Sequence, residues 1–325
     1  MLNIAYKLVL GSASQQSGKT SDLLALETCA ALGIPVNTCR IVLASQSPFS
    51  LNPDDAVSVE LGYDGTPTKV FTGKVATVER GIECITINAA SAFSALTAAR
   101  YNCLYEKQNA GDIAGDLLGR LQVDKGAVAT GEKFASFSVS GQRPVWDVLF
   151  ELARRCGFDF YADVEDKAVF EQYAARKTHG LEYGVHLLDF VQDSLAPALD
   201  GVEVYGESPV GQGQGEDASS WLTKKEVKGT AGKSTGNVLR LSDAAARTQD
   251  LVNAIAGNIL QTRQTRLRGR LGVLGNPEVQ LGDAVTVSKL PDSAQNGTYK
   301  VTGVRHRLNA RVGFVTEIGW EKTVD

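Results

Sequence analysis

The chain has 325 residues, of which 43% are hydrophobic and 22% are charged, and its formal net charge is −4. This length predicts about two domains, and the hydrophobic content is high enough to exclude a disordered chain. A mildly acidic balance argues against a dedicated nucleic-acid-binding protein, which should be basic. The 33 glycines beside only 9 prolines indicate many turns and therefore a β-rich fold.

No stretch of the sequence predicts a membrane span or a secretion signal. No apolar run reaches the roughly 18 residues that cross a bilayer, and Lys7 interrupts the short apolar N-terminus. We therefore expect a protein made in the bacterial cytoplasm without a signal peptide or membrane insertion. The cysteines show no CxxC spacing and the histidines no metal-binding spacing, so we expect reduced thiols, no metal site and no cofactor. These residues are Cys29, Cys39, Cys84, Cys103, Cys156, His179, His186 and His306.

Residues 1–100 predict a first tube-like β-barrel. Tyr6, Leu8 and Leu10 alternate with other residues at a period of two, which is typical of a strand. Further short apolar segments separated by turn residues favour a small barrel or sandwich. Residues 11–20 are expected to form a polar loop, and residues 23–32 fit either a helix or a strand. The predicted strands cover residues 4–10, 40–44, 57–61, 69–72, 74–79 and 82–87.

Residues 101–180 change to a helical period and predict an α+β insertion. Asp112 is expected to cap a first helix, and Pro144 opens a second one that ends at Gly157. A hairpin over residues 158–173 follows. The apolar faces of the two helices consist of Ile113, Leu117, Leu118 and Leu121, and of Val145, Val148, Leu149 and Leu152.

Residues 181–325 predict a second tube-like β-barrel. This segment includes a long polar loop at residues 207–237 and one helix at residues 243–262, capped by Ser242 or Asp243. Asn296-Gly297 predicts a hairpin turn. The fold class is therefore mainly β with an α+β insertion and two small barrels per chain. The predicted strands cover residues 202–205, 267–274, 283–288, 298–307 and 314–320, and the helix face consists of Leu251, Val252, Ile255 and Ile259.

Motifs that could carry catalysis are weak in this sequence. Residues 13–20 fit a relaxed P-loop that ends in Lys19-Thr20, but its first glycine is missing and no strand–helix alternation follows. Asp112 and Asp116 share a helix face, yet a cap and a solvated residue explain them. Ser138 to Gly141 do not form the GxSxG turn of a serine hydrolase. We expect no catalytic residues and a protein that is not an enzyme.

A basic stripe is the most distinctive charge feature. Arg266, Arg268 and Arg270 alternate with apolar residues and glycine, so one face of a strand carries three guanidiniums. Arg305 and Arg307 form a smaller copy around His306. The stripe could face the carboxylates of a partner or nucleic acid in a lumen, or it could be a solvated sheet face neutralised by nearby acids. These five arginines are the candidate interface or lumen-facing residues.

Ten short stretches carry a resemblance to a known family. They cover residues 23–27, 33–43, 59–63, 70–75, 85–89, 111–114, 145–153, 157–161, 277–283 and 297–306. Each stretch is weak by itself, but by their order and spacing the chain resembles the contractile-tail baseplate hub proteins of the phage late control gene D family, which is related to the N-terminal hub region of VgrG proteins.

The resemblance implies a structural hub subunit. Three protomers, each with two barrels, would form a ring that adapts the sixfold inner tube to the threefold spike. The implied partners are the homotrimer, the tube protein above, the spike protein below and other baseplate proteins, with nucleic acid at most in transit. The chain stops at Asp325, so we expect a separate spike protein or none. The implied location is a virion tail baseplate or an injection particle. The alternatives are a P-loop nucleotide-binding protein and a β module that binds a cell surface or peptidoglycan.

Overall fold

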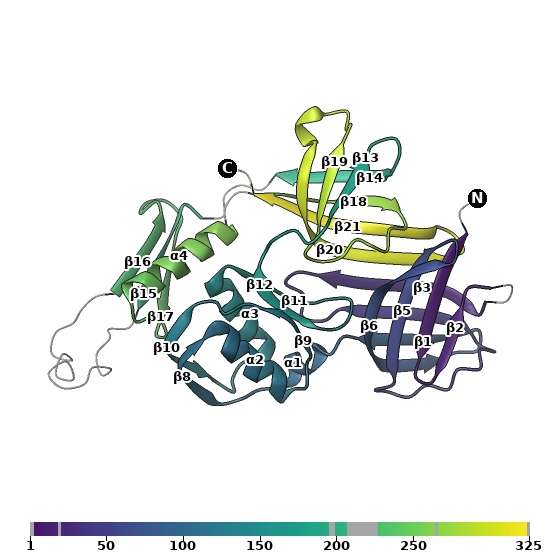
Figure 1. The fold of residues 1–325 in the computed structure, drawn as a ribbon, viewed down its shortest axis with the longest axis horizontal. Coiled ribbons are helices and arrows are strands. Elements are labelled where there is room, and N and C mark those ends of the chain that lie inside the picture. The colour runs from purple at the N-terminus through teal and green to yellow at the C-terminus, as the bar shows by residue number, and fades with distance from the viewer. Residues whose placement is uncertain (1–2, 19–20, 195–198, 207–226, 264–265, 324–325) are drawn as a thin grey trace.

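A computed structural model of the chain describes residues 3–18, 21–194, 199–206, 227–263 and 266–323. The fold of these residues is mainly β, as predicted, and its three longer helices lie between residues 110 and 263. Figure 1 shows a first β region in purple, an α+β insertion in teal, a small α/β unit in green and a second β region that ends in yellow. No helix in this part of the chain has both the length and the apolar character that a membrane crossing requires.

The first β region consists of seven strands and confirms the strands predicted there. Residues 23–32, ambiguous from the sequence, form a strand in which Leu26 and Thr28 are buried and Glu27 between them is not. The loop predicted for residues 11–20 is wrong in part, because four of its residues pair with the first strand. The strands are β1 (Ile4–Leu10), β2 (Ala13–Gln16), β3 (Leu23–Ala31), β4 (Thr38–Ala44), β5 (Ala56–Tyr63), β6 (Thr66–Arg80) and β7 (Cys84–Ala90).

The long strand β6 folds this region around its core. Its first part pairs with β5 and its last part pairs with β7, so the sheet turns over on itself. The enclosed core is largely aliphatic, since burying apolar surface is the main driving force for closing the two halves of the sheet. Its fully buried members include Leu8, Ile41, Leu43, Leu61 and Ile87.

The second β region has its own core, built around aromatic rings. Trp320 is 1% exposed and its ring lies 4.3 Å from that of Tyr299 and 5.3 Å from that of Phe190. Residues 289–296 connect two antiparallel strands through a 3₁₀ turn, η2 (Ser293–Gln295), so the Asn296-Gly297 hairpin has a longer loop than a two-residue turn. The strands are β13 (Thr178–Glu182), β14 (Leu187–Ser194), β18 (Arg266–Leu274), β19 (Ala284–Ser288), β20 (Gly297–Asn309) and β21 (Gly313–Thr323).

One strand pair joins the two β regions into a single sheet. Residues 303–309 of β20 pair with β3, while the beginning of the same edge of β20 pairs with β19. The 13-stranded sheet runs from β14 to β2, and no ladder among the described residues closes either region. The two predicted barrels are therefore not confirmed, because the edge of β20 that could close the second region is shared with the first. A side-chain contact also joins the two regions: the rings of Tyr63 on β5 and Phe314 on β21 lie 5.6 Å apart.

The insertion packs its helices on two small sheets, as the helical period predicted. Asn109, not Asp112, is the N-cap of α2, and Asp112 lies in its first turn, where a negative charge favours the helix dipole. Gly157 ends α3 in the left-handed conformation with φ 68°, as predicted. The elements are α1 (Ser94–Ala98), β8 (Cys103–Asn109), α2 (Ala110–Arg120), β9 (Lys125–Val128), β10 (Lys133–Val139), α3 (Val145–Cys156), β11 (Phe158–Ala162) and β12 (Ala168–Gln172).

A small α/β unit corrects part of the sequence interpretation. Of the predicted loop 207–237, residues 207–226 lie outside the described residues, but residues 227–232 form a strand. The helix begins at Gln249, not at residue 243, and the Leu251 N–H donates to Thr248 Oγ1 at 3.3 Å. Its predicted apolar face is buried in a core shared with the insertion, whereas the sequence grouped this segment with the second β region. The elements are β15 (Gly201–Gly206), β16 (Val227–Gly232), β17 (Val238–Asp243) and α4 (Gln249–Arg263).

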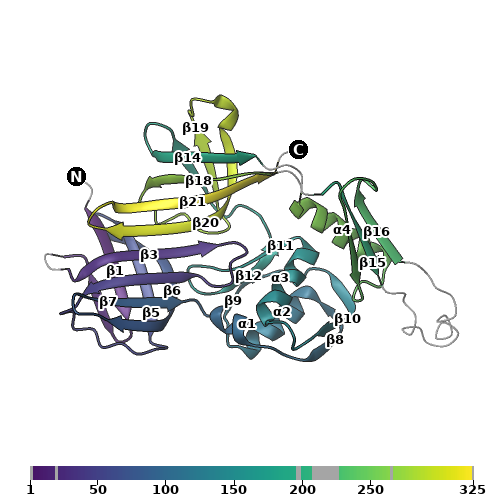
Figure 2. The ribbon, with the colours of Figure 1, turned by 180° about the vertical axis from the view of Figure 1, so that it is seen from behind.

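The insertion lies against both β regions near the ends of β3 and β20, as both ribbon views show (Figure 2). Asn37 Nδ2 donates to the Ala162 carbonyl at 2.9 Å, and the Ala92 N–H donates to the carboxylate of Asp166 at 2.8 Å. Burial raises the pKa of Asp166 to about 6. On the other side, the Tyr161 hydroxyl donates to the Leu281 carbonyl at 3.2 Å. The insertion is thus fixed to the sheet by directional bonds as well as by packing.

Candidate interface on the outer face of the sheet

The predicted arginines lie on one face of the sheet, the side opposite the two cores, which we call the outer face. On β18, Leu271 and Val273 are buried in the core, whereas Arg268 and Arg270 alternate with them and are exposed. Arg270 Nε lies 3.9 Å from Asp189 Oδ2 on the neighbouring β14. For Arg266 the structure describes only the backbone, which pairs with Thr323.

The second arginine group lies on β20, which is separated from β18 by β21 in the same sheet. His306 between the two arginines is buried, so Arg305 and Arg307 both project to the outer face. Arg305 Nη2 lies 2.8 Å from Glu27 Oε1 on β3, and Arg307 Nη2 lies 3.6 Å from Glu317 Oε2 on β21. The hydrogen bond that Arg305 donates to the Glu27 carboxylate raises the pKa of Arg305. These two arginines are therefore neutralised by carboxylates.

Strand β21 brings the two arginine groups together and places acidic residues between them. Its register sets Glu317 opposite Arg305 on one side, and Glu321 opposite Arg268 on the other. Basic and acidic side chains therefore lie opposite one another on neighbouring strands of the outer face. Sequence reasoning identified the arginines but could not show that strands 35 residues apart share a face, because pairing depends on backbone bonds.

Two further basic residues belong to this face and were not predicted. Lys300 Nζ lies 2.8 Å from Asp159 Oδ1 and 3.5 Å from Glu321 Oε1. Arg40 on β4 is exposed and is the register partner of Glu27. The alternation of Arg40 with the buried Cys39 and Ile41 is the signal that could have identified it.

The ion pairs of the outer face suit an interface better than a catalytic site. Exposed pairs contribute about 0–1 kcal/mol each to stability, so exchanging a partner for one on another chain costs little. In the insertion, the predicted Asp116 and the turn residue Asp163 already serve the fold. Asp116 accepts from the Tyr105 hydroxyl at 2.6 Å and from Arg120 Nε at 2.8 Å, and Asp163 Oδ1 accepts from two N–H groups of its own turn.

The P-loop motif takes a different form from the one that phosphate binding needs. Residues 13–16 are extended and pair with β1, and the next described element is strand β3, not a helix. A phosphate cradle requires a loop of free N–H groups at the start of a helix. Lys19 and Thr20 lie outside the described residues.

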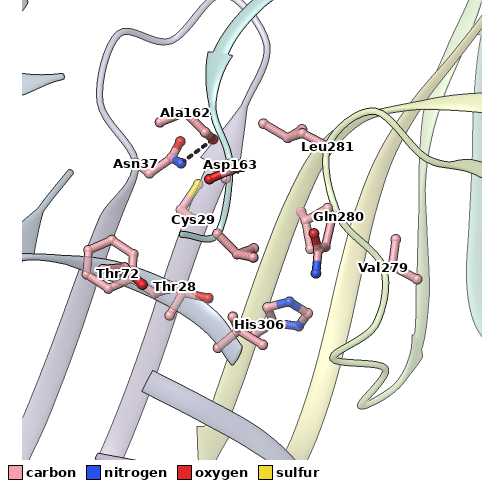
Figure 3. Close-up of a pocket in the computed structure, with 15 residues that line it drawn as sticks. Thr28, Cys29, Asn37, Thr72, Ala162, Asp163, Val279, Gln280, Leu281 and His306 are labelled. Atoms are coloured by element: carbon pink, nitrogen blue, oxygen red, sulfur yellow. Dashed lines mark hydrogen bonds between the residues drawn. The ribbon is translucent and has the colours of Figure 1, made fainter. Parts of the chain in front are cut away.

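A pocket where the two β regions meet the insertion is too small for a substrate (Figure 3). Thr28, Ala162, Gln280 and His306 surround it, and its volume is about 30 Å³. That volume holds one or two water molecules, whereas ligand sites usually measure about 300–1,000 Å³. Burial lowers the pKa of His306 to about 3, so this ring is neutral near pH 7, and its Nδ1 lies 2.9 Å from Thr316 Oγ1. We interpret the pocket as a packing gap.

Comparisons with known proteins agree with the whole-chain fold. A family model described as the Alg8 N-terminal domain matches residues 42–310. No curated protein matches the chain in sequence. A tail protein from Neisseria meningitidis MC58 has a similar structure, with a TM-score of 0.71, 13% identity, and coverage of 98% of this chain and 96% of that one.

Two other solved structures have the same fold. The 43 kDa tail protein of prophage MuSo2 from Shewanella oneidensis has a TM-score of 0.70 and 12% identity, and covers 98% of both chains. The c3393 protein of E. coli, a component of the type VI secretion system, has a TM-score of 0.57 and 11% identity, and covers 96% of this chain and 76% of that one. The predicted likeness to tail proteins is confirmed at the level of the fold, whereas the late control gene D family itself stays a prediction.

Proposed function

This chain belongs to the family of the Alg8 N-terminal domain, and from its fold we propose that it is a structural hub subunit of a contractile phage tail or a phage-like injection system. The observation that carries the proposal is the match in fold to prophage tail proteins over 98% of the chain. The match includes both β regions, the insertion and the α/β unit in one order. A fold alone does not define a function, so the proposal needs its own test.

We propose further that three copies form a ring that adapts a sixfold tube to a threefold spike. Each β region would serve as one barrel-like module of that ring, giving six modules in all. Two free strand edges support a ring: among the described residues, β14 and β2 each pair on one side only, and they lie at opposite ends of the sheet. Exposed strand edges are sites for pairing, and a ring requires two different surfaces that meet head to tail. Leu188 in β14 is 57% exposed, and Val185, just before this strand, is 62% exposed.

The outer face would line the lumen or contact a neighbouring subunit in this ring. Its mixed charges suit contact with proteins, and the arginines Arg268 and Arg270 near the β14 edge are exposed. The proposed partners are the tube protein above, a spike protein below and other baseplate proteins, inside a tail or an injection particle. The role is mechanical, without catalysis.

The mass of the purified chain tests the ring directly. Light scattering after gel filtration should give three times 34.6 kDa, about 104 kDa, at high protein concentration. Electron microscopy of the same fraction should show a ring with a central hole. A monomer at every concentration, together with a failure to assemble when the tube protein is added, would contradict the hub.

A charge variant tests the outer face separately. Replacing Arg268 and Arg270 by glutamate should reduce the trimer fraction or the binding of tube protein, because like charges would then face each other. The control is Arg311→Glu, since Arg311 is exposed in the turn between β20 and β21. An equal effect of the control would refute a specific role of this face.

A further inference from the structure

A cleft next to the outer face lies where the insertion, the α/β unit and both β regions meet, and Lys300 and Glu321 of the outer face form part of its lining. Its walls come from α3 and β11 of the insertion, from the C-terminal end of α4, and from the ends of β3 and β20. Its volume is about 530 Å³, within the range of ligand-binding sites and far above the small pocket of Figure 3. The aromatic rings of Phe150 and Phe158 form part of its lining.

Two arginines that line this cleft form no close ion pair. Arg154 at the end of α3 and Arg263 at the end of α4 both line the cleft, and neither forms an ion pair with a residue that the structure describes. Burial and the nearby charge of Arg263 lower the pKa of Arg154, while the charge of Glu151 acts in the opposite direction. Because Arg263 is exposed, the repulsion between the two cations costs most at the partly buried Arg154.

Arg155, the next residue of α3, differs from Arg154 because it forms ion pairs within the chain. Arg155 Nε lies 2.7 Å from Asp243 Oδ2 and its Nη2 lies 3.2 Å from Glu151 Oε1. It thereby links α3 to the α/β unit. Helix ends explain part of the placement of Arg154 and Arg263, because cations are favourable there. They do not explain why both side chains line one cleft without forming ion pairs with its carboxylates.

The carboxylates that line the cleft pair with a lysine and not with these arginines. Lys300 pairs with both Asp159 and Glu321 and lies over the Tyr173 ring at 4.7 Å. The cleft therefore presents two guanidiniums without close ion pairs, together with aromatic rings and this lysine–carboxylate cluster.

We propose that this cleft binds an acidic peptide segment of a partner protein, with its carboxylates on Arg154 and Arg263. Guanidiniums bind carboxylates through paired hydrogen bonds, which are strongest where water is partly excluded. The aromatic rings would pack against the aliphatic stems of the segment. A thymidine oligonucleotide carries the same sign of charge, so it serves below as the competitor that distinguishes carboxylates from phosphates. This inference does not depend on assembly into a tail.

Binding of a fluorescein-labelled hexaglutamate peptide, followed by anisotropy, tests the cleft with the full chain. Saturable binding is expected, and Arg154→Gln/Arg263→Gln should weaken it by about tenfold or more, since hydrogen bonds to charged groups are lost. The matched control is Arg80→Gln/Arg100→Gln, which removes the same charge from two exposed residues outside the cleft. Its affinity should stay within about twofold of wild type.

A charge-reversal variant shows whether weaker peptide binding comes from the changed charge or from a loss of folding. Arg154→Glu/Arg263→Glu should lose hexaglutamate and bind fluorescein-labelled hexalysine more tightly than the wild type does. The proposal is overturned if the wild type shows no saturable hexaglutamate binding or if the control weakens as much as the cleft variant. It is also overturned if a thymidine hexanucleotide competes as well as unlabelled hexaglutamate, because the site would then accept phosphates in general.

Discussion

The two β regions share one sheet but build their cores in different ways. The first encloses aliphatic side chains such as Leu43 and Ile87 between the halves of a folded sheet. The second packs around stacked rings, with Trp320 between Phe190 and Tyr299. Its edge strands β13 and β14 are consecutive in the chain, yet they do not pair with each other. Two regions that look like repeats in sequence pattern therefore rely on different stabilising contacts, and they depend on each other through β3 and β20.

The largest expected effect concerns the aromatic core. Trp320→Ala should lower the free energy of unfolding by about 3–5 kcal/mol, because it removes a fully buried ring and leaves a cavity. Leu43→Ala in the first region should cost about 2–5 kcal/mol for the same reason. Urea unfolding followed by circular dichroism measures both.

The shape of the unfolding curve tests whether the regions depend on each other. Since β20 pairs with strands of both regions, each variant should shift one common transition. Leu188→Ala, at an exposed side chain, is the control and should stay within about 0.5 kcal/mol of wild type. Two separate transitions, of which only one moves in each variant, would show that the regions unfold independently.

A pH effect is expected at the junction of the two regions. His306 is buried there, and its pKa falls from 6.5 to about 3 on folding. The unfolded chain therefore binds the proton more readily, so this contribution to stability is complete above pH 6.5 and declines as the pH falls from 6.5 toward 3. The loss should approach about 1.4 kcal/mol per pH unit.

Comparison of wild type with His306→Gln isolates this contribution. The variant should lose less stability between pH 6.5 and 4 than the wild type, as measured by urea unfolding at each pH. Asp166 acts with the opposite sign, because its raised pKa adds stability at low pH that is lost as the pH rises from 3.8 to about 6. Both proteins contain Asp166, so its effect cancels in the difference. Parallel pH curves would contradict the role of His306.

A smaller effect is expected for the ion pair that bridges the regions. Arg305 and Glu27 are each about two-fifths exposed, at 41% and 38%. A double-mutant cycle with Arg305→Gln and Glu27→Gln should give a coupling of about 0–1 kcal/mol, because solvent screens the pair. Raising the salt concentration should reduce the coupling further. A coupling far above that range would mean that the junction depends on charge as well as on strand pairing.

The smallest effect is expected at the far edge of the outer face. Arg270 and Asp189 are 62% and 58% exposed and lie 3.9 Å apart. Arg270→Gln should change the free energy of unfolding by less than about 0.5 kcal/mol in thermal or urea unfolding. A larger loss would show that the β14 edge depends on this pair, and the contrast with the junction would disappear.

Local patterns predicted most of the elements because they report on local geometry. Alternation in β1 and the helical stripe of α3 identify which side faces a core, and Gly157 marks a helix end through its backbone freedom. Caps and loop boundaries were less certain, as Asp112 and the strand β16 show. Several residues near a helix end can serve as a cap, and a glycine-rich segment such as residues 227–232 has little side-chain signal for a strand.

The sequence by itself determined a mainly β chain with an α+β insertion, the apolar faces of its helices and the arginines of its outer strands. Only the tertiary structure decided that β3 pairs with β20, that Glu27 and Glu317 neutralise Arg305 and Arg307, and that Arg154 and Arg263 share a cleft. The physical reason is the same in each case. The spacing of apolar residues along the chain indicates the secondary structure of that segment alone. Pairing between distant segments depends on backbone hydrogen bonds and packing, which no local pattern encodes.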